Sequence, residues 1–113
     1  MVAFMSVVRF KVRPEQTEAF VSTWSNGPPA PGRVSLRLIQ TGDCQFCGVS
    51  EWEAEDAIAA ARPDLIKFLD TIRPMLVEIS PVLGFTDPVS GPVVAERYPE
   101  RLNRKIGVTP ISH

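Results

Sequence analysis

The period of the hydrophobic pattern changes along the chain in a set order, and this order constrains the fold more than any other feature of the sequence. A period of two is typical of strands, and a period near 3.6 is typical of helices. The order strand, helix, strand, strand, helix, strand predicts an α+β fold of the ferredoxin-like βαββαβ type, with both helices on one face of an antiparallel sheet. The expected segments are strand 2–13, helix 14–26, strand 34–39, strand 44–53, helical region 54–79 and strand 82–86.

Eleven prolines punctuate these segments. Pro14 suits the first turn of a helix, because the N–H that proline lacks has no partner there in any case. Pro63 is predicted to start a new helical turn after a short lead-in over residues 54–61, and Pro74 is predicted to kink the helix. Residues 87–88, Asp-Pro, are predicted to end the last strand.

The length and net charge of the chain limit the number of domains and the kinds of partner that can be expected. A chain of 113 residues is one domain in length. We expect this domain to span residues 1–95, and we expect the aperiodic residues 96–113 to form a tail that frays or packs on a partner subunit. A net charge of -1 gives little attraction to nucleic acid or acidic membranes. With no apolar run long enough for a bilayer and no signal-peptide pattern, the sequence predicts a cytoplasmic protein.

The face of the sheet away from the helices is predicted to be apolar. A soluble monomer would rarely leave such a patch bare, so the pattern predicts a homodimer whose sheets face each other. Three charged residues, Arg9, Arg37 and Glu51, belong to the same face. They are expected to form an ion-pair network at the interface edge, with a substrate-binding arginine as the alternative. The patch consists of Ala3, Met5, Val7, Ile39, Cys47 and Val49.

The pair Cys44 and Cys47 has the spacing of a zinc or redox motif. Zinc requires four ligands, and the sequence has a single histidine, His113, so no metal site is predicted. A redox cysteine is expected at a helix N-terminus, whereas this pair belongs to a strand pattern. Two reduced structural thiols are the favoured interpretation, and a redox site is the alternative.

The helix-facing row of the first and third strands predicts a cavity. Gly48 leaves room in this row, and Trp24 on the first helix is expected nearby. Apolar walls with two hydroxyls and an indole donor suit a flat aromatic molecule. The alternative is that these residues are core residues whose polar atoms are satisfied locally. The row consists of Phe4, Ser6, Val8, Phe10, Phe46, Gly48, Ser50 and Trp52.

Three stretches of the sequence resemble the antibiotic biosynthesis monooxygenase (ABM) domain superfamily, the dimeric α+β barrels. They are residues 7–15 leading into Phe20, residues 51–57 and residues 87–93. The resemblance covers roughly residues 2–95. It implies a ferredoxin-like subunit, a barrel dimer and a pocket between sheet and helices. Members include cofactor-free oxygenases of polyphenolic substrates, haem-degrading enzymes and proteins with no assigned reaction.

The haem-degrading branch of that family uses an Asn on the first strand, a Trp ending the third and a His on the following helix. Of these, only Trp52 matches, because the Asn position falls near Val8 and the helix offers Arg62 instead of histidine. Haem ligation is therefore not expected, and no cofactor is predicted.

Two hypotheses follow for function. The first is a cofactor-independent monooxygenase acting on a small aromatic or polyphenolic compound, with Trp52 and Ser6 as catalytic residues. The second is a non-catalytic homodimer that binds a small apolar ligand or another protein. No strong general base is evident, although Glu51, Glu53 and Arg62 are expected at the pocket mouth. The expected substrate-binding residues are Phe4, Val8, Trp24, Phe46, Ser50 and Arg62.

Overall fold

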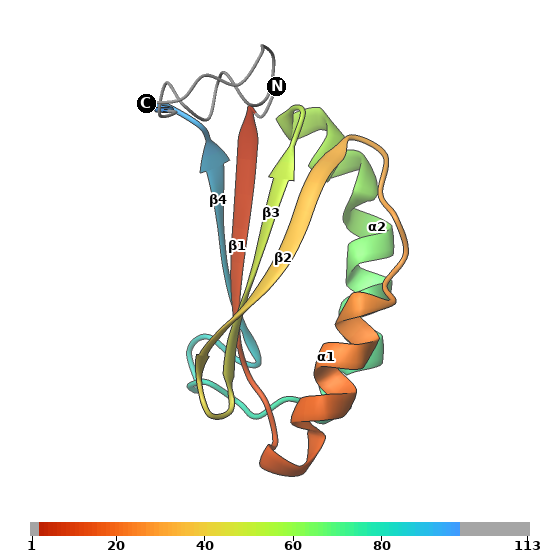
Figure 1. The fold of residues 1–113 in the computed structure, drawn as a ribbon, viewed down its shortest axis with the longest axis vertical. Coiled ribbons are helices and arrows are strands. Elements are labelled where there is room, and N and C mark those ends of the chain that lie inside the picture. Colours follow the sequence, from red (N-terminus) through yellow and green to blue (C-terminus); the bar gives the residue numbers. More distant parts are fainter. Residues whose placement is uncertain (1–2, 98–113) are drawn as a thin grey trace, which may run out of the picture.

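A computed structural model describes residues 3–97 as a four-stranded antiparallel sheet with its helices on one face (Figure 1). The strand order is β2-β3-β1-β4, so the two central strands are β1 and β3. This arrangement confirms the predicted ferredoxin-like α+β fold. Residues 98–113 of the predicted tail lie outside the described residues. The elements are β1 (Phe4–Lys11), η1 (Pro14–Gln16), α1 (Thr17–Ser25), β2 (Arg33–Gly42), β3 (Gln45–Trp52), α2 (Glu55–Ile72), η2 (Arg73–Met75) and β4 (Thr86–Pro92).

The central position of β1 explains its composition. It pairs with β3 on one side and with β4 on the other, so both of its edges are hydrogen-bonded. β2 and β3 form the predicted hairpin, with Gly42 opposite Gln45 at its closed end. The helix that was predicted to start at Pro14 is also present, as η1 leading into α1. Among residues 3–97, no helix is long and apolar enough to cross a membrane.

Pro63 lies inside α2 and does not divide it, contrary to the prediction of a new turn at this residue. Proline at this position removes the N–H that would bond to the carbonyl of Ala59. Both residues are exposed, so water can solvate the freed carbonyl. The helix therefore continues unbroken from Glu55 to Ile72.

Pro74 ends the helical region, and the predicted kinked helix reaching residue 79 is wrong. α2 stops at Ile72, and the 3₁₀ turn η2 contains Pro74. The chain then extends, because Leu76 forms a β-bridge with Val12 and the amide of Val77 donates to the carbonyl of Lys11 at 2.7 Å. These long-range backbone bonds take the place of further helical bonds.

The last strand begins where the sequence predicted it to end. Residues 81–83 form a turn, which Gly84 continues with a positive φ of 77°. β4 then runs through Pro88, which lies opposite Val8 of β1. A sheet edge tolerates proline because the absent N–H would face away from the neighbouring strand. The prediction that residues 87–88 terminate the strand failed because it did not recognise β4 as an edge strand.

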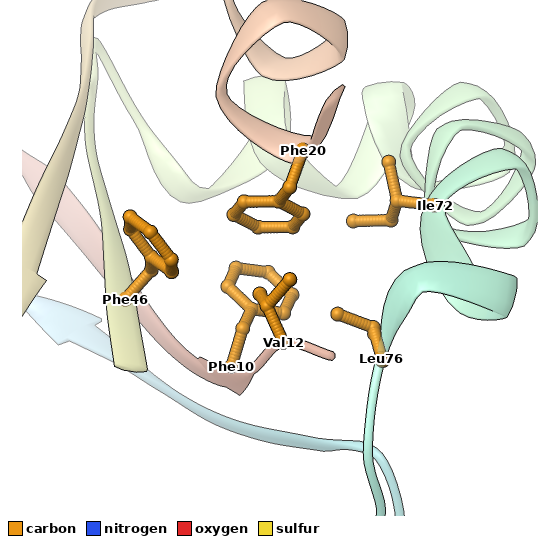
Figure 2. Packing of buried hydrophobic residues seen from close by; sticks show 6 residues of the cluster. All are labelled: Phe10, Val12, Phe20, Phe46, Ile72 and Leu76. Atoms are coloured by element: carbon orange, nitrogen blue, oxygen red, sulfur yellow. The ribbon is translucent and has the colours of Figure 1, made fainter. Parts of the chain in front are cut away.

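A cluster of aromatic and aliphatic side chains joins the sheet to both helices (Figure 2). The ring centroids of Phe10 and Phe20 are 5.5 Å apart, and those of Phe20 and Phe46 are 5.2 Å apart. Edge-to-face and tilted ring pairs of this kind are favourable beyond their buried area. The cluster consists of Phe10, Val12, Phe20, Phe46, Ile72 and Leu76.

Phe20 lies at the centre of this cluster and is fully buried, so its truncation is expected to be costly. We predict that Phe20→Ala lowers the free energy of unfolding by about 3–5 kcal/mol, because it leaves a cavity among aromatic rings. Urea denaturation followed by circular dichroism measures this loss. The adjacent and exposed Val21 provides the control, since Val21→Ala should change stability by less than about 1 kcal/mol. Equal losses in the two variants would contradict the packing described.

Candidate functional site

The register between β1 and β3 aligns large residues with large ones and small residues with small ones on the helix-facing side of the sheet. Phe4 pairs with Trp52 and Phe10 pairs with Phe46. Between these outer rows, small residues face one another in two inner rows. The inner rows pair Ser6 with Ser50 and Val8 with Gly48. Because large side chains stand at both ends and small ones lie between them, a hollow forms between the sheet and the helices.

This hollow is a cavity of about 430 Å³, which is within the size range of small-molecule sites. Its floor is made by the two inner rows, and its far wall is made by apolar residues of α2, among them Ile58, Leu65 and Phe68. Trp24 of α1 lies at one end, where its ring meets Phe68 with centroids 5.6 Å apart. Trp52 lies at the other end, and most of the surface that lines the cavity is apolar.

Three serines cross the cavity floor in one row. Ser90 of β4 lies opposite Ser6, which in turn lies opposite Ser50. The indole N–H of Trp52 donates to the Ser50 hydroxyl at 2.8 Å, and both residues are buried. Within the described part of the chain, the hydroxyls of Ser6 and Ser90 make no hydrogen bond, so both can bond to a ligand.

Trp24 packs directly on the backbone of Gly48. A Cβ atom at position 48 would lie 2.6 Å from two ring carbons of Trp24, so a glycine is required for this close approach. The indole N–H of Trp24 is buried and has no partner among residues 3–97. A buried unpaired donor is costly, which makes this N–H a second group that a ligand acceptor could satisfy.

Arg33 is a cavity residue that the sequence analysis did not identify. It begins β2 directly opposite Trp52, and its guanidinium carbon lies 5.8 Å from the centre of the Trp52 ring. Its Nη2 donates to the carbonyl of Pro28 at 3.0 Å. Burial lowers the pKa of Arg33 from its ordinary value, because desolvation disfavours the charged form. An arginine near a buried tryptophan in register was the available signal, but the register could not be fixed from the sequence.

The structure brings six of the predicted site residues to the cavity and places two elsewhere. Phe4 belongs to a core cluster with Trp52, Ile58 and Ala61 and does not line the cavity. Phe46 belongs to the aromatic cluster of Figure 2 and borders an adjoining hollow between β2 and α1. Binding and catalytic roles remain predictions for all eight. The six that line the cavity are Ser6, Val8, Trp24, Ser50, Trp52 and Arg62.

Glu51 does not lie at the cavity mouth, contrary to the prediction. It alternates with Ser50 and Trp52 along β3 and therefore lies on the outer face of the sheet. There it accepts a hydrogen bond from Ser35 and forms an ion pair with Arg37 at 3.7 Å. The carboxylate that does line the cavity belongs to Asp64 of α2, an exposed residue.

The outer face of the sheet carries the predicted apolar patch, and β4 extends it with Val89. The register aligns Val49, Val7 and Val89 in one row across three strands. Val89 is 62% exposed and Ile39 is 49% exposed. The predicted charge ladder on this face is only partly present, because Arg9 forms its ion pair with Asp87 of β4 and not with Glu51.

Between residues 3 and 97 there is no group of three or more His, Cys, Asp or Glu side chains that could hold a metal ion. Cys44 and Cys47 are both free thiols. Cys44 lies in the hairpin turn, and Cys47 lies on the outer face beside Arg9. Neither lines the cavity.

Comparison with protein-family models and with curated proteins gave no match. Solved structures with the same fold do exist, and some are described as antibiotic biosynthesis monooxygenases, which confirms the predicted resemblance at the level of fold. Identities between 10% and 20% support a shared fold and nothing finer.

Three of these structures illustrate the range of described proteins that share this fold. SnoaB, a cofactor-independent oxygenase from Streptomyces nogalater, is 19% identical with a TM-score of 0.64, and the match covers 88% of this chain and 100% of SnoaB. The ActVA-Orf6 monooxygenase of Streptomyces coelicolor, solved with nanaomycin D, is 20% identical with a TM-score of 0.67, covering 88% and 94%. A dimeric ferredoxin-like protein from an uncultured marine organism is 10% identical with a TM-score of 0.68, covering 88% and 95%.

The contact between Gly48 and Trp24 yields a test of the cavity geometry. We predict that Gly48→Ala lowers the free energy of unfolding by about 1–3 kcal/mol, because the added methyl group forces the Trp24 ring to move. Thermal denaturation measures the loss, and tryptophan fluorescence reports the ring movement. Gly42→Ala on the same sheet is the control, since its Cβ would make an ordinary contact of 3.5 Å with Gln45. If Gly48→Ala were as stable as Gly42→Ala, Trp24 would not pack on the sheet as described.

Proposed function

We propose that this protein is a cofactor-independent monooxygenase that acts on a small aromatic or polyphenolic compound. The observation that carries the proposal is the cavity of about 430 Å³, whose walls are apolar and whose floor has a line of serine hydroxyls. Apolar walls supply affinity for a flat ring system, and a few hydroxyls fix its orientation. The fold that this chain shares with solved oxygenases supports the same proposal.

The proposed chemistry needs no external reductant. An electron-rich phenol and one molecule of O₂ yield a quinone and one molecule of water, so one oxygen atom enters the ring and the other leaves as water. The substrate supplies all the electrons, and its two displaced hydrogens leave in the water. The protein must bind the phenol, favour its deprotonated form and exclude bulk water. Trp52 and Ser6 would position the ring, each from a different strand of the cavity floor.

The protein is proposed to act as a homodimer whose outer sheet faces pack together. The row of Val49, Val7 and Val89 is the apolar centre that such an interface would bury. The charged pairs Arg37–Glu51 and Arg9–Asp87 would lie around this centre. One solved structure with this fold is described as dimeric, which supports the proposal. Two free thiols are compatible with the reducing cytoplasm as its compartment.

A second candidate function is a non-catalytic dimer that binds a small ligand in the same cavity. One observation favours it specifically: the Trp52 N–H already donates to Ser50 at 2.8 Å, so this indole is not free to bond to a substrate. In that case Trp52 would act only as a wall of the cavity. Oxygen consumption separates the two candidates.

The role of Trp52 is tested with 1,8-dihydroxyanthrone, a flat phenol whose central CH₂ group becomes a carbonyl on reaction with O₂. We predict that the wild-type protein accelerates O₂ uptake above the spontaneous rate, and that Trp52→Phe slows it about tenfold or more, because the ring loses its positioning surface. An oxygen electrode measures the rate, and circular dichroism checks the fold. Lys67→Met, a change on an exposed part of α2, is the control. Binding of the anthrone without any acceleration by wild-type protein would favour the non-catalytic candidate.

The proposed dimer is tested on its own. Val7 lies at the centre of the outer face, so Val7→Glu would bury an unpaired carboxylate in the interface. We predict a wild-type dimer at micromolar concentration and a folded monomeric variant, as measured by sedimentation velocity. Val82→Glu is the matched control, because Val82 lies in an exposed turn and is 93% exposed. A monomeric wild-type protein would refute the proposed interface.

A further inference from the structure

Arg33 is a partly buried cation without a counter-ion in the described part of the chain. Its side chain forms no ion pair with any residue in the range 3–97, and the single hydrogen bond of its guanidinium goes to the neutral carbonyl of Pro28. A guanidinium has five N–H donors, so most of its donors have no protein partner in the described chain. Taking a charge out of water without a partner is unfavourable. Binding of an anion beside Arg33 would offset this desolvation cost.

The surroundings of Arg33 favour a ligand that carries its negative charge on an aromatic ring. Trp52 lies beside the guanidinium from β3, and the Pro28 carbonyl holds it from the connector that precedes β2. Arg62 and Asp64 of α2 are the other charged residues that line the cavity, and both are exposed. Glu53, which follows Trp52, is exposed and makes no ion pair with Arg33.

The remaining polar groups of the cavity are mainly donors. The N–H of Trp24 has no partner in the described chain, and the hydroxyls of Ser6 and Ser90 are free to donate. Donors and a cation along an apolar cavity wall stabilise negative charge, because a lower local dielectric strengthens each interaction. Asp64 is the one carboxylate on the lining of the described cavity.

The geometry points to Arg33 as the residue that binds the oxyanion of an aromatic ligand, holding a phenol in its deprotonated form against Trp52. This inference rests on the proposed function, because it concerns the same cavity. It also supplies what that function lacks. No cavity-lining residue in the described chain is a histidine, so a guanidinium that lowers the pKa of the bound phenol would replace a general base.

The probe for this inference is 4-nitrophenol, which titrates near neutral pH and whose phenolate form is yellow. Its apparent pKa is measured free and bound by absorbance across a pH series. We expect the bound form to titrate about one unit or more below the free form, because a cation beside a phenolate favours ionisation. One unit is equal to a tenfold preference for the phenolate over the phenol.

Three variants separate the charge of Arg33 from its structural contact with Pro28. Arg33→Met should raise the pKa of bound 4-nitrophenol to the free value or above it, since an apolar cavity disfavours an anion. Arg33→Lys should restore part of the shift, because lysine keeps the charge and loses the planar fork. Lys67→Met removes the same charge from an exposed position on α2 and should bind like the wild type.

A neutral probe guards against simple misfolding. 4-Nitroanisole has the same ring and cannot ionise, so Arg33→Met should bind it within about twofold of the wild type. An equal pKa of bound 4-nitrophenol in the wild type and in Arg33→Met would overturn the role of Arg33. The proposal that the cavity binds aromatic compounds would not be affected by that result. Loss of 4-nitroanisole binding in Arg33→Met would also overturn it, because the residue would then be structural. A wild-type protein that binds neither probe would overturn the proposed function and this inference together.

Discussion

The pairing of β1 with β3 is the constraint on which the rest of the molecule depends. It places Phe4 against Trp52 and Phe10 against Phe46, with only small residues between. The two helices then pack on the large residues at either end and span the hollow between them. A shift of one residue would turn every side chain to the opposite face, so the core, the cavity and the apolar outer face share one register.

The cavity is therefore held open by packing at its two ends and not by the residues of its floor. The aromatic cluster around Phe20 fixes α1, and the cluster around Trp52 fixes the start of α2. Between them, Gly48 lets the Trp24 ring approach the sheet and close one end. The small residues that line the floor could not maintain an open space by themselves, because protein interiors otherwise collapse to close packing. Rigid aromatic supports at both ends keep the middle open.

The order of elements and the helix-facing row were predictable from the sequence, because alternation with period two assigns each side chain of β1 and β3 to a face. Three features were not. Pro88 predicts a strand end unless β4 is known to be an edge strand. Pro63 predicts a helix start unless both it and Ala59 are known to be exposed. Arg33 becomes a site residue only through its position opposite Trp52, which is a long-range contact. Each depends on tertiary neighbours, which local patterns do not contain.

The prolines of β4 have a consequence for how copies of this protein can meet. Pro88 and Pro92 cannot donate backbone hydrogen bonds, so a strand added alongside β4 would find an interrupted ladder. At the opposite edge, β2 has irregular register near Arg33 and again near Gly42, which also makes it a poor template. Growth of the sheet from copy to copy, the first step of edge-driven aggregation, is thus disfavoured on both sides.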